Sequence, residues 1–240
     1  MRAKSFFILA LMACGAAAIF SQGNSVPIAQ EQHHHLIIEN TYARVYEVEV
    51  PPHESTLLHQ HDFDYLYVVL GAADITNAVA GKPVVNTHLD DTAVNFAKGP
   101  LTHVAGNTGD KPFRNITISL LKKQGEPKVY FPSIKAALDA TIKDKQSAES
   151  TEVTVLETAQ MRVKAVQVGN GPSWTYSNPT GPFLIINLDK AKLFDQPGPR
   201  EKNAPTFPAD MMHWYANESR AFFPAAYPAG PMLVVIEFNK

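Results

Sequence analysis

Hydrophobic and polar residues alternate along several short stretches of the chain. Alternation with a period of two is the pattern of a β-strand with one buried face. The stretches LLHQHDFDYLYVV (57–69), LIIENTYARVYEVEV (from Leu36) and FRNITISL (from Phe113) all show it. Eighteen prolines and thirteen glycines are spread over 240 residues, which suits strands joined by turns. The pattern therefore predicts an all-β protein.

The strand pattern occurs twice. LIIENTYARVYEVEV aligns with TVLETAQMRVKAVQV at a constant shift of 118 residues, which pairs Leu36 with Thr154. The same shift pairs FRNITISL with PMLVVIEF near the end of the chain. Internal similarity at a fixed shift indicates a repeated structural unit. We therefore expect two homologous β domains.

The repeat assigns residues 36–121 to the first domain, 122–153 to a linker and 154–240 to the second domain. In the linker, SIKAALDATIKDK places apolar residues four apart, which predicts one short helix.

A second similarity has a different shift. HVAGN and HWYAN share the spacing His-x3-Asn, which pairs His103 with His213 and Asn107 with Asn217 at a shift of 110. It predicts that the second domain is shortened before His213 and lengthened after it.

The N-terminus has the pattern of an export signal. Arg2 and Lys4 precede the apolar stretch FFILALMACGAAAIF, so we expect residues 1–30 to form a signal and an arm. LMACG resembles a lipoprotein lipobox, which leaves two alternatives, a lipid anchor on Cys14 or cleavage near residues 21–23. Either predicts a periplasmic or extracellular protein. The histidines of EQHHHLII (His33, His34 and His35) are expected to lie on a solvated arm.

Charge excludes one class of partner. Charged residues make up 18% of the chain and the net charge is −2, so no basic field attracts nucleic acid. The single cysteine lies in the signal, so no disulfide is expected.

His59 and His61 are two residues apart in a strand-like stretch, so both face one side. They are either a metal-binding pair inside a barrel or a polar pair on an exposed strand. The same parity extends to Phe63, expected to fill the barrel, and to Tyr65, while Asp62 and Asp64 point outward.

The motifs around these histidines resemble those of the cupin superfamily. PPHESTLLHQHDFDYLYVVLGAADI is similar to the first cupin motif, with His-x-His. FAKGPLTHVAGN is similar to the second, Pro-x-Gly-x2-His-x3-Asn, although Lys98 and Pro100 replace its usual proline and glycine. The resemblance implies two tandem double-stranded β-helix (jelly-roll) barrels, and many cupins form homodimers.

The resemblance also implies a divalent metal held by His59, His61 and His103. Its usual glutamate ligand is replaced by Tyr65, so the expected site is three imidazoles plus water. Fe, Zn, Mn, Ni and Cu all suit such ligands. Tyr65 and Tyr67 are the candidate catalytic residues, as hydrogen-bond donors to a substrate oxygen. Asn107 is expected to cap a turn.

The second domain lacks this ligand set. The shift of 118 places Ser177, Pro179 and Phe183 opposite His59, His61 and Tyr65. We expect a degenerate, structural cupin in which His213 is a core or interface residue. Its aromatic residues are expected either to line an apolar pocket or, preferentially, to pack against the first domain; they are Trp174, Tyr176, Trp214 and Tyr215.

Two functions are consistent with these features. One is a metal-dependent enzyme, dioxygenase-like or isomerase-like, acting on a small oxygenated substrate. The other is a non-catalytic exported module that binds or senses a metal or small molecule.

Overall fold

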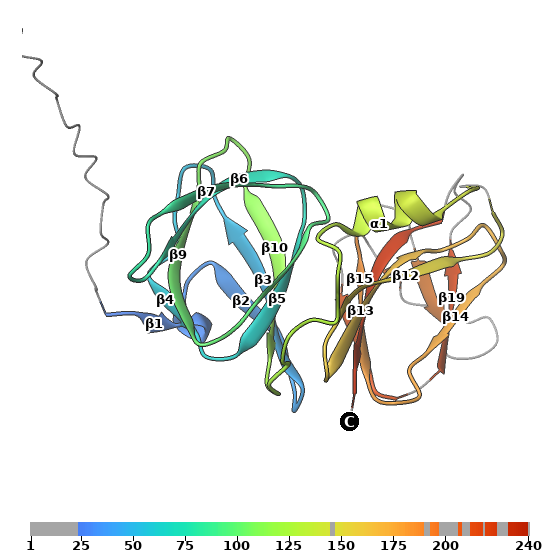
Figure 1. The fold of residues 1–240 in the computed structure, drawn as a ribbon. Helices are drawn as coiled ribbons and strands as arrows, with labels where there is room; N and C mark the ends of the chain where they lie inside the picture. The colour runs from blue at the N-terminus through green and yellow to red at the C-terminus, as the bar shows by residue number, and fades with distance from the viewer. Residues whose placement is uncertain are drawn as a thin grey trace, which may run out of the picture.

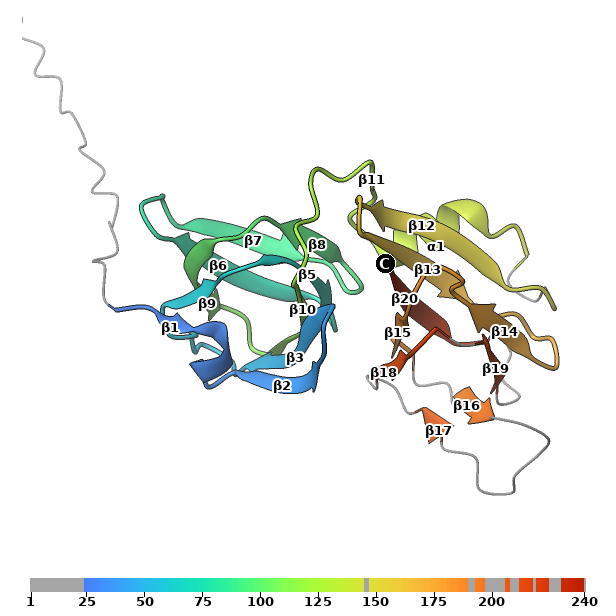
Figure 2. The same cartoon turned by 90° about the horizontal axis from the view of Figure 1, so that it is seen from below.

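Two β-barrels lie side by side in the computed structural model of the chain (Figures 1 and 2). The structure describes residues 24–144, 147–189, 193–196, 206–207, 212–217, 219–224 and 230–239. The predicted all-β class is confirmed. The predicted signal and Cys14 lie outside the described residues. No helix in the described ranges has the length and apolar character needed to cross a membrane.

The first barrel is made of two five-stranded sheets with the orders β1-β4-β9-β6-β7 and β2-β3-β10-β5-β8. The strands are Val26–Pro27 (β1), His34–Glu39 (β2), Ala43–Val50 (β3), His59–His61 (β4), Asp64–Val69 (β5), Ala73–Val79 (β6), Val85–Leu89 (β7), Val94–Ala97 (β8), Leu101–Asn107 (β9) and Phe113–Leu120 (β10). A 3-10 helix, η1 (Ile28–Gln30), follows β1. The barrel thus begins before residue 36, the predicted start of the domain.

The second barrel has sheets with the orders β11-β12-β13-β20-β15-β18 and β14-β19-β16-β17. Their strands are Val129–Tyr130 (β11), Thr151–Glu157 (β12), Met161–Gln167 (β13), Trp174–Ser177 (β14), Phe183–Asn187 (β15), Leu193–Gln196 (β16), Thr206–Phe207 (β17), Met212–Tyr215 (β18), Ser219–Pro224 (β19) and Met232–Phe238 (β20). The helix α1 (Ile134–Thr141) lies in the predicted linker, and the Ser133 hydroxyl accepts a hydrogen bond from the backbone N–H of Ala136 at its start.

The shift of 118 holds in the strand pairing. Arg44 on β3 pairs with Glu39 on β2, and Arg162 on β13 pairs with Glu157 on β12. Each of these strand pairs also contains a register shift, and the two shifts lie 118 residues apart. The two barrels are therefore built on the same plan.

The pairing of His103 with His213 is wrong. His213 lies on β18 and pairs with Ile185, as Asn95 on β8 pairs with Tyr67 in the first barrel. These positions again differ by 118, so His213 corresponds to Asn95. His103 lies on β9, in the other sheet. The similarity of HVAGN and HWYAN is local, and His213 is exposed rather than a core or interface residue.

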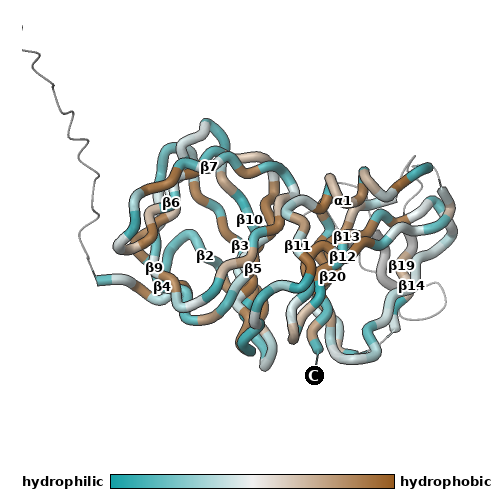
Figure 3. Tube along the Cα trace, in the orientation of Figure 1, coloured by the Kyte–Doolittle hydropathy of each residue, from teal (hydrophilic) through white to brown (hydrophobic). Residues whose placement is uncertain are grey.

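A hydrophobic core lies between the two barrels. On β5 and β10, one face of each strand contributes Leu66, Ile116 and Ile118 to this core, and the second barrel contributes residues such as Val163 and Ile236. Figure 3 shows apolar segments gathered where the barrels meet. The outer face of one first-barrel sheet is thus covered by the second barrel.

The aromatic residues of the second barrel pack in two different places. Trp214 lies against the first barrel, with its ring centroid 6.0 Å from that of Tyr42. Trp174, Tyr176 and Tyr215 instead belong to the core inside the second barrel. The predicted packing against the first domain therefore holds for Trp214 alone among these four residues.

Candidate metal centre

The three histidines predicted as metal ligands lie together in the first barrel. His59 and His61 are on β4, and His103 on the neighbouring strand β9 pairs directly with His59. The Nε2 atom of His61 lies 3.1 Å from Nε2 of His59 and 3.2 Å from Nε2 of His103. Metal–nitrogen bonds of about 2.0–2.1 Å place adjacent ligand atoms about 2.9–3.4 Å apart. This spacing suits one shared cation.

A fourth histidine, His34, joins the cluster from β2 in the opposite sheet. Its ring centroid lies 4.8 Å from that of His59, and the ligand nitrogens of His34, His59 and His61 all lie within 4.8 Å of one another. The predicted solvated arm is wrong here, because β2 pairs with β3 and turns His34 inward, while His33 is also buried. His35 alone of the three is exposed. Four imidazoles thus lie in this interior: Nε2 contacts join His59, His61 and His103, and His34 groups with His59 and His61.

Hydrogen bonds fix the orientation of three of these rings. Nδ1 of His34 contacts Oε2 of Glu31 at 2.6 Å, Nδ1 of His59 contacts the Leu57 carbonyl oxygen at 2.9 Å, and Nδ1 of His103 contacts Oδ1 of Asn77 at 2.8 Å. Each of these oxygens is an acceptor, so each Nδ1 carries a hydrogen, and in a neutral ring Nε2 then keeps its lone pair. Ligand histidines in metal sites are commonly held in this way.

The chemistry of the donor set fits a divalent metal. Nε2 of His61 contacts the Nε2 atoms of His59 and His103, both of which carry lone pairs. A hydrogen on Nε2 of His61 can be donated to only one of them, which leaves the lone pair of the other without a hydrogen, and without that hydrogen all three nitrogens present lone pairs to one another. A cation shared by these nitrogens removes the conflict, so the residues present suit a bound metal.

Burial keeps the ligands in the protonation state that a metal requires. It lowers the pKa of His59 to about 4, of His61 to about 2 and of His103 to about 3, and neighbouring imidazoles lower all three further. These rings are therefore neutral at pH 7. Burial alone would raise the pKa of Glu31, but the hydrogen bonds from His34 and from the Leu57 N–H outweigh it and lower that pKa to about 2.

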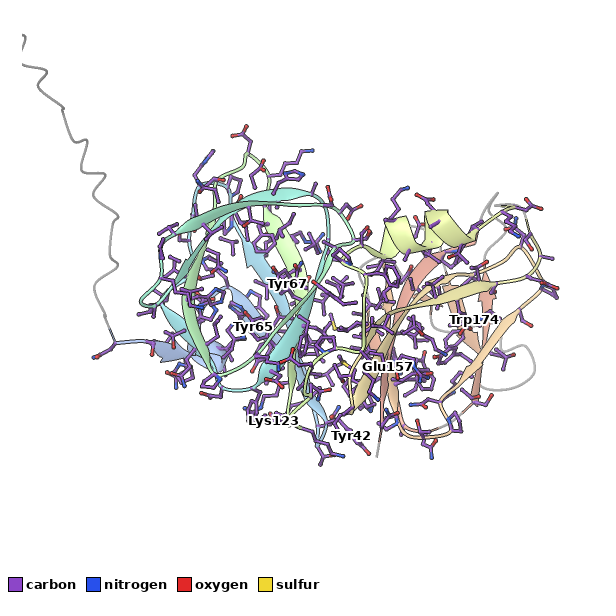
Figure 4. The ribbon with its side chains drawn as sticks, in the orientation of Figure 1. Tyr42, Tyr65, Tyr67, Lys123, Glu157 and Trp174 are labelled. Atoms are coloured by element: carbon purple, nitrogen blue, oxygen red, sulfur yellow. The ribbon has the colours of Figure 1, made fainter. Side chains whose placement is uncertain are left out.

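The two candidate catalytic tyrosines line the same interior (Figure 4). The Tyr65 ring stacks on His61 with centroids 3.9 Å apart, and Tyr67 follows at 6.5 Å from Tyr65. Burial raises the pKa of Tyr65 and raises that of Tyr67 to about 12, so both hydroxyls are protonated at pH 7. The stack holds His61, whose Nδ1 is buried without a hydrogen-bond partner among the described residues.

The segment between β4 and β5 breaks the predicted parity, because the chain passes there from one sheet to the other. Phe63 is 36% exposed and does not fill the barrel. Asp64 does not line the cavity inside the barrel, as predicted, but it is buried on the other side, where it accepts hydrogen bonds from the backbone N–H groups of Gly99 and Gln124 at 3.1 and 2.9 Å. A Cβ at Gly99 would lie 2.3 Å from the Phe63 carbonyl oxygen, so this contact requires glycine.

Asn107 has the structural role that was expected. Its Nδ2 donates to the carbonyl oxygens of Val50, Pro51 and Lys111, and its Oδ1 accepts from the N–H of Gly109. It therefore fixes the turn after β9.

A cavity of about 200 Å³ adjoins the four histidines. Its other polar lining residues are Thr56, Tyr65, Tyr67, Asn77, Asn95, Asn115 and Thr117. Its apolar lining residues are Val48, Val50, Ile75, Phe96, Ala97, Leu101, Ala105 and Phe113. This volume is below the range of about 300–1,000 Å³ typical of sites for drug-sized ligands. The cavity thus suits a small molecule.

Aromatic side chains fill the corresponding space in the second barrel. The rings of Trp174 and Phe222 lie 5.2 Å apart, and Phe183, at the position of Tyr65, stacks on Tyr215 at 4.9 Å. Glu237, at the position of Ser119, accepts a hydrogen bond from the Tyr176 hydroxyl at 2.6 Å. This interior is packed, which agrees with a structural role for the barrel.

Comparisons with known proteins agree with the fold. No family model matches the chain, and no curated protein does. The structure is similar to a cupin 2 conserved barrel domain protein from Leptotrichia buccalis, with a TM-score of 0.57, 8% identity and coverage of 92% of both chains.

Two further solved structures are also similar. One is a salicylate 1,2-dioxygenase from Pseudaminobacter salicylatoxidans (TM-score 0.58, 10% identity, 82% of this chain and 70% of that one). The other is a putative glyoxylate induced protein from Pseudomonas aeruginosa (TM-score 0.56, 13% identity, 82% and 74%). At these identities the likeness concerns the fold. The chain therefore has the cupin fold, as two barrels in tandem.

Proposed function

We propose that the first barrel binds one divalent transition metal through His34, His59, His61 and His103. The observation that carries this proposal is the convergence of Nε2 atoms at 3.1 and 3.2 Å, with three of the rings oriented by acceptors at Nδ1. Neutral imidazoles suit Fe²⁺, Zn²⁺, Mn²⁺, Ni²⁺ and Cu²⁺, and the ligand set does not choose among them.

We further propose that the site is catalytic, as a dioxygenase-like or isomerase-like enzyme acting on a small oxygenated substrate. A bound metal of this kind supplies Lewis-acid polarisation or O₂ chemistry. Support comes from the small cavity beside the histidines and from the fold shared with a salicylate 1,2-dioxygenase. The reaction type rests on analogy between proteins of one fold.

The chain's own residues have definable roles in such a reaction. The protonated hydroxyls of Tyr65 and Tyr67 make no hydrogen bond within the described part of the chain and are free to donate to a substrate oxygen. The apolar wall, which includes Val50, Ile75 and Phe113, excludes water and strengthens these interactions.

We also propose that the protein is exported, to the periplasm or the cell exterior. The charged and apolar N-terminal pattern supports this. Mass spectrometry of the mature protein separates cleavage near residues 21–23 from a lipid on Cys14 and from an unprocessed chain, which would contradict export.

A second candidate function is a non-catalytic binding or sensing module. It is favoured by one observation: the cavity lining contains no Asp, Glu, Lys or Arg to serve as a general acid or base.

Elemental analysis of protein purified from metal-supplemented medium tests the metal site. We expect about one equivalent of metal, lost in the His59→Ala, His61→Ala double variant. Less than about a tenth of an equivalent, unchanged by the substitutions, contradicts the proposal.

A thermal-shift screen of small oxygenated compounds, combined with oxygen-uptake and isomerisation assays, separates the two functions. Turnover that depends on the metal supports the enzyme. Stabilisation without turnover supports the binding module.

A further inference from the structure

One wall of the cavity is polar but uncharged. Asn95 on β8, Tyr67 on β5 and Thr117 on β10 are neighbours across one sheet, because Tyr67 pairs with both of the others. All three line the cavity, as does Asn115, two residues before Thr117. Tyr67, the second ring of the stack on His61, connects this wall to the metal centre.

This wall offers hydrogen-bond donors. The Nδ2 atom of Asn95 is buried and has no hydrogen-bond partner among the described residues. The Thr117 hydroxyl donates a hydrogen bond to Oδ1 of Asn115 at 2.7 Å. The NH₂ group of Asn115 is the part of this amide that can donate to a ligand. A buried donor without a partner destabilises the protein unless a ligand or water accepts from it.

The same wall has no cation. None of the cavity-lining residues is Lys or Arg. A ligand carboxylate placed at this wall would therefore lose its hydration without gaining an ion-pair partner. A neutral carbonyl oxygen accepts from these amides at much lower desolvation cost. An apolar group would leave the Asn95 donor unpaired.

We propose that Asn95 and Asn115, whose amide is oriented by Thr117, form a subsite for a neutral acceptor oxygen at the end of the ligand remote from the metal. The substrate class is a small molecule with an oxygen-donor head and a ketone-like or amide-like carbonyl at its other end. This inference rests on the proposed metal site.

Three hydroxamates of equal size test the subsite. They share a metal-binding head and differ only in the tail, which is a ketone (4-oxopentanohydroxamate), a branched alkyl group (4-methylpentanohydroxamate) or a carboxylate (3-carboxypropanohydroxamate). Their affinities are measured with the Co²⁺-loaded full chain by calorimetry and by the Co²⁺ absorption spectrum. We expect the ketone compound to bind at least about fivefold more tightly than either isostere.

The Asn95→Leu variant removes the donor with little change of volume. We expect it to bind the ketone and alkyl compounds equally, with unchanged Co²⁺ stoichiometry. Asn86→Leu, at an exposed position on β7, is the matched control and should retain the preference.

The outcomes separate the two proposals. A protein that binds no Co²⁺ overturns the metal site and the subsite with it. A protein that binds Co²⁺ and none of the hydroxamates, or binds all three equally, overturns only the subsite. Retention of the ketone preference in Asn95→Leu overturns the assignment of Asn95.

Discussion

Glu31 and His34 form a carboxylate–imidazole pair, with Oε2 of Glu31 2.6 Å from Nδ1 of His34. The other oxygen of the carboxylate accepts from the N–H of Leu57 at 3.1 Å, and the carbonyl of Leu57 accepts from Nδ1 of His59. Glu31 therefore connects two candidate ligands from opposite sheets, and its side chain is fully buried.

The Glu31→Gln substitution should weaken metal binding. An amide keeps the size of the side chain but removes the negative charge that orients His34, a change that typically lowers metal affinity about 10–100-fold. Chelator competition measures the effect. Glu39→Gln, which alters an exposed ion pair with Arg44, is the control and should leave the affinity unchanged. Equal affinities for the two variants would rule out a positioning role for Glu31.

His34 and His35 provide a comparison between adjacent residues of the same type. His34→Ala should lower metal affinity at least about tenfold, because it removes a ligand, while His35→Ala should have no effect because its side chain is exposed. Elemental analysis after dialysis against a weak chelator measures both. Full metal retention in His34→Ala would show that His34 is not a ligand and that the site has three imidazoles.

The metal-free protein should lose stability as the pH falls from about 6.5 towards 4. The folded-state pKa values of His59, His61 and His103 lie below the ordinary 6.5, so in this window the unfolded chain binds more protons than the folded one. Each such histidine contributes a slope of up to about 1.4 kcal/mol per pH unit.

Urea unfolding of chelator-treated protein at several pH values checks this slope. Below pH 4.5, Glu31 adds a loss in the same direction until its folded pKa of about 2. The His61→Gln variant has one titrating group fewer and should show a shallower dependence. A stability that stays constant between pH 6.5 and 5 would show that these rings are not held neutral by burial.

Removal of the metal should lower the unfolding temperature. A ligand present at about 1,000 times its dissociation constant stabilises the folded state by about 4 kcal/mol. Differential scanning calorimetry with and without chelator measures the shift. The His59→Ala, His61→Ala double variant should not respond, and a response of the same size would place the stabilising metal elsewhere.

Much of the fold and part of the site could be predicted from the sequence. The resemblance of His-x-His and His-x3-Asn to the cupin motifs predicted three residues that the structure brings together, and strand parity, a local property, independently placed His59 and His61 on one face. The repeat predicted two barrels, since alternation survived at a constant shift in both.

His34 could not be found in this way, because its position depends on the pairing of β2 with Val48 and its neighbours on β3. The available signal was the continuation of the strand pattern upstream through HHHLII. The wrong pairing of His213 with His103 has the opposite cause. The short His-x3-Asn similarity predicts a shift of 110, whereas the strand register follows the constant shift of 118 to the end of the chain.

The apolar layer shared by the barrels limits where the chain can be truncated. Leu66, Ile116 and Ile118 are fully buried in a core to which the C-terminal half contributes residues such as Val163 and Ile236. A fragment ending near residue 121 would present these side chains to water and would aggregate, although it retained every candidate ligand. The second barrel thus acts as a permanent partner that covers the apolar face of the first.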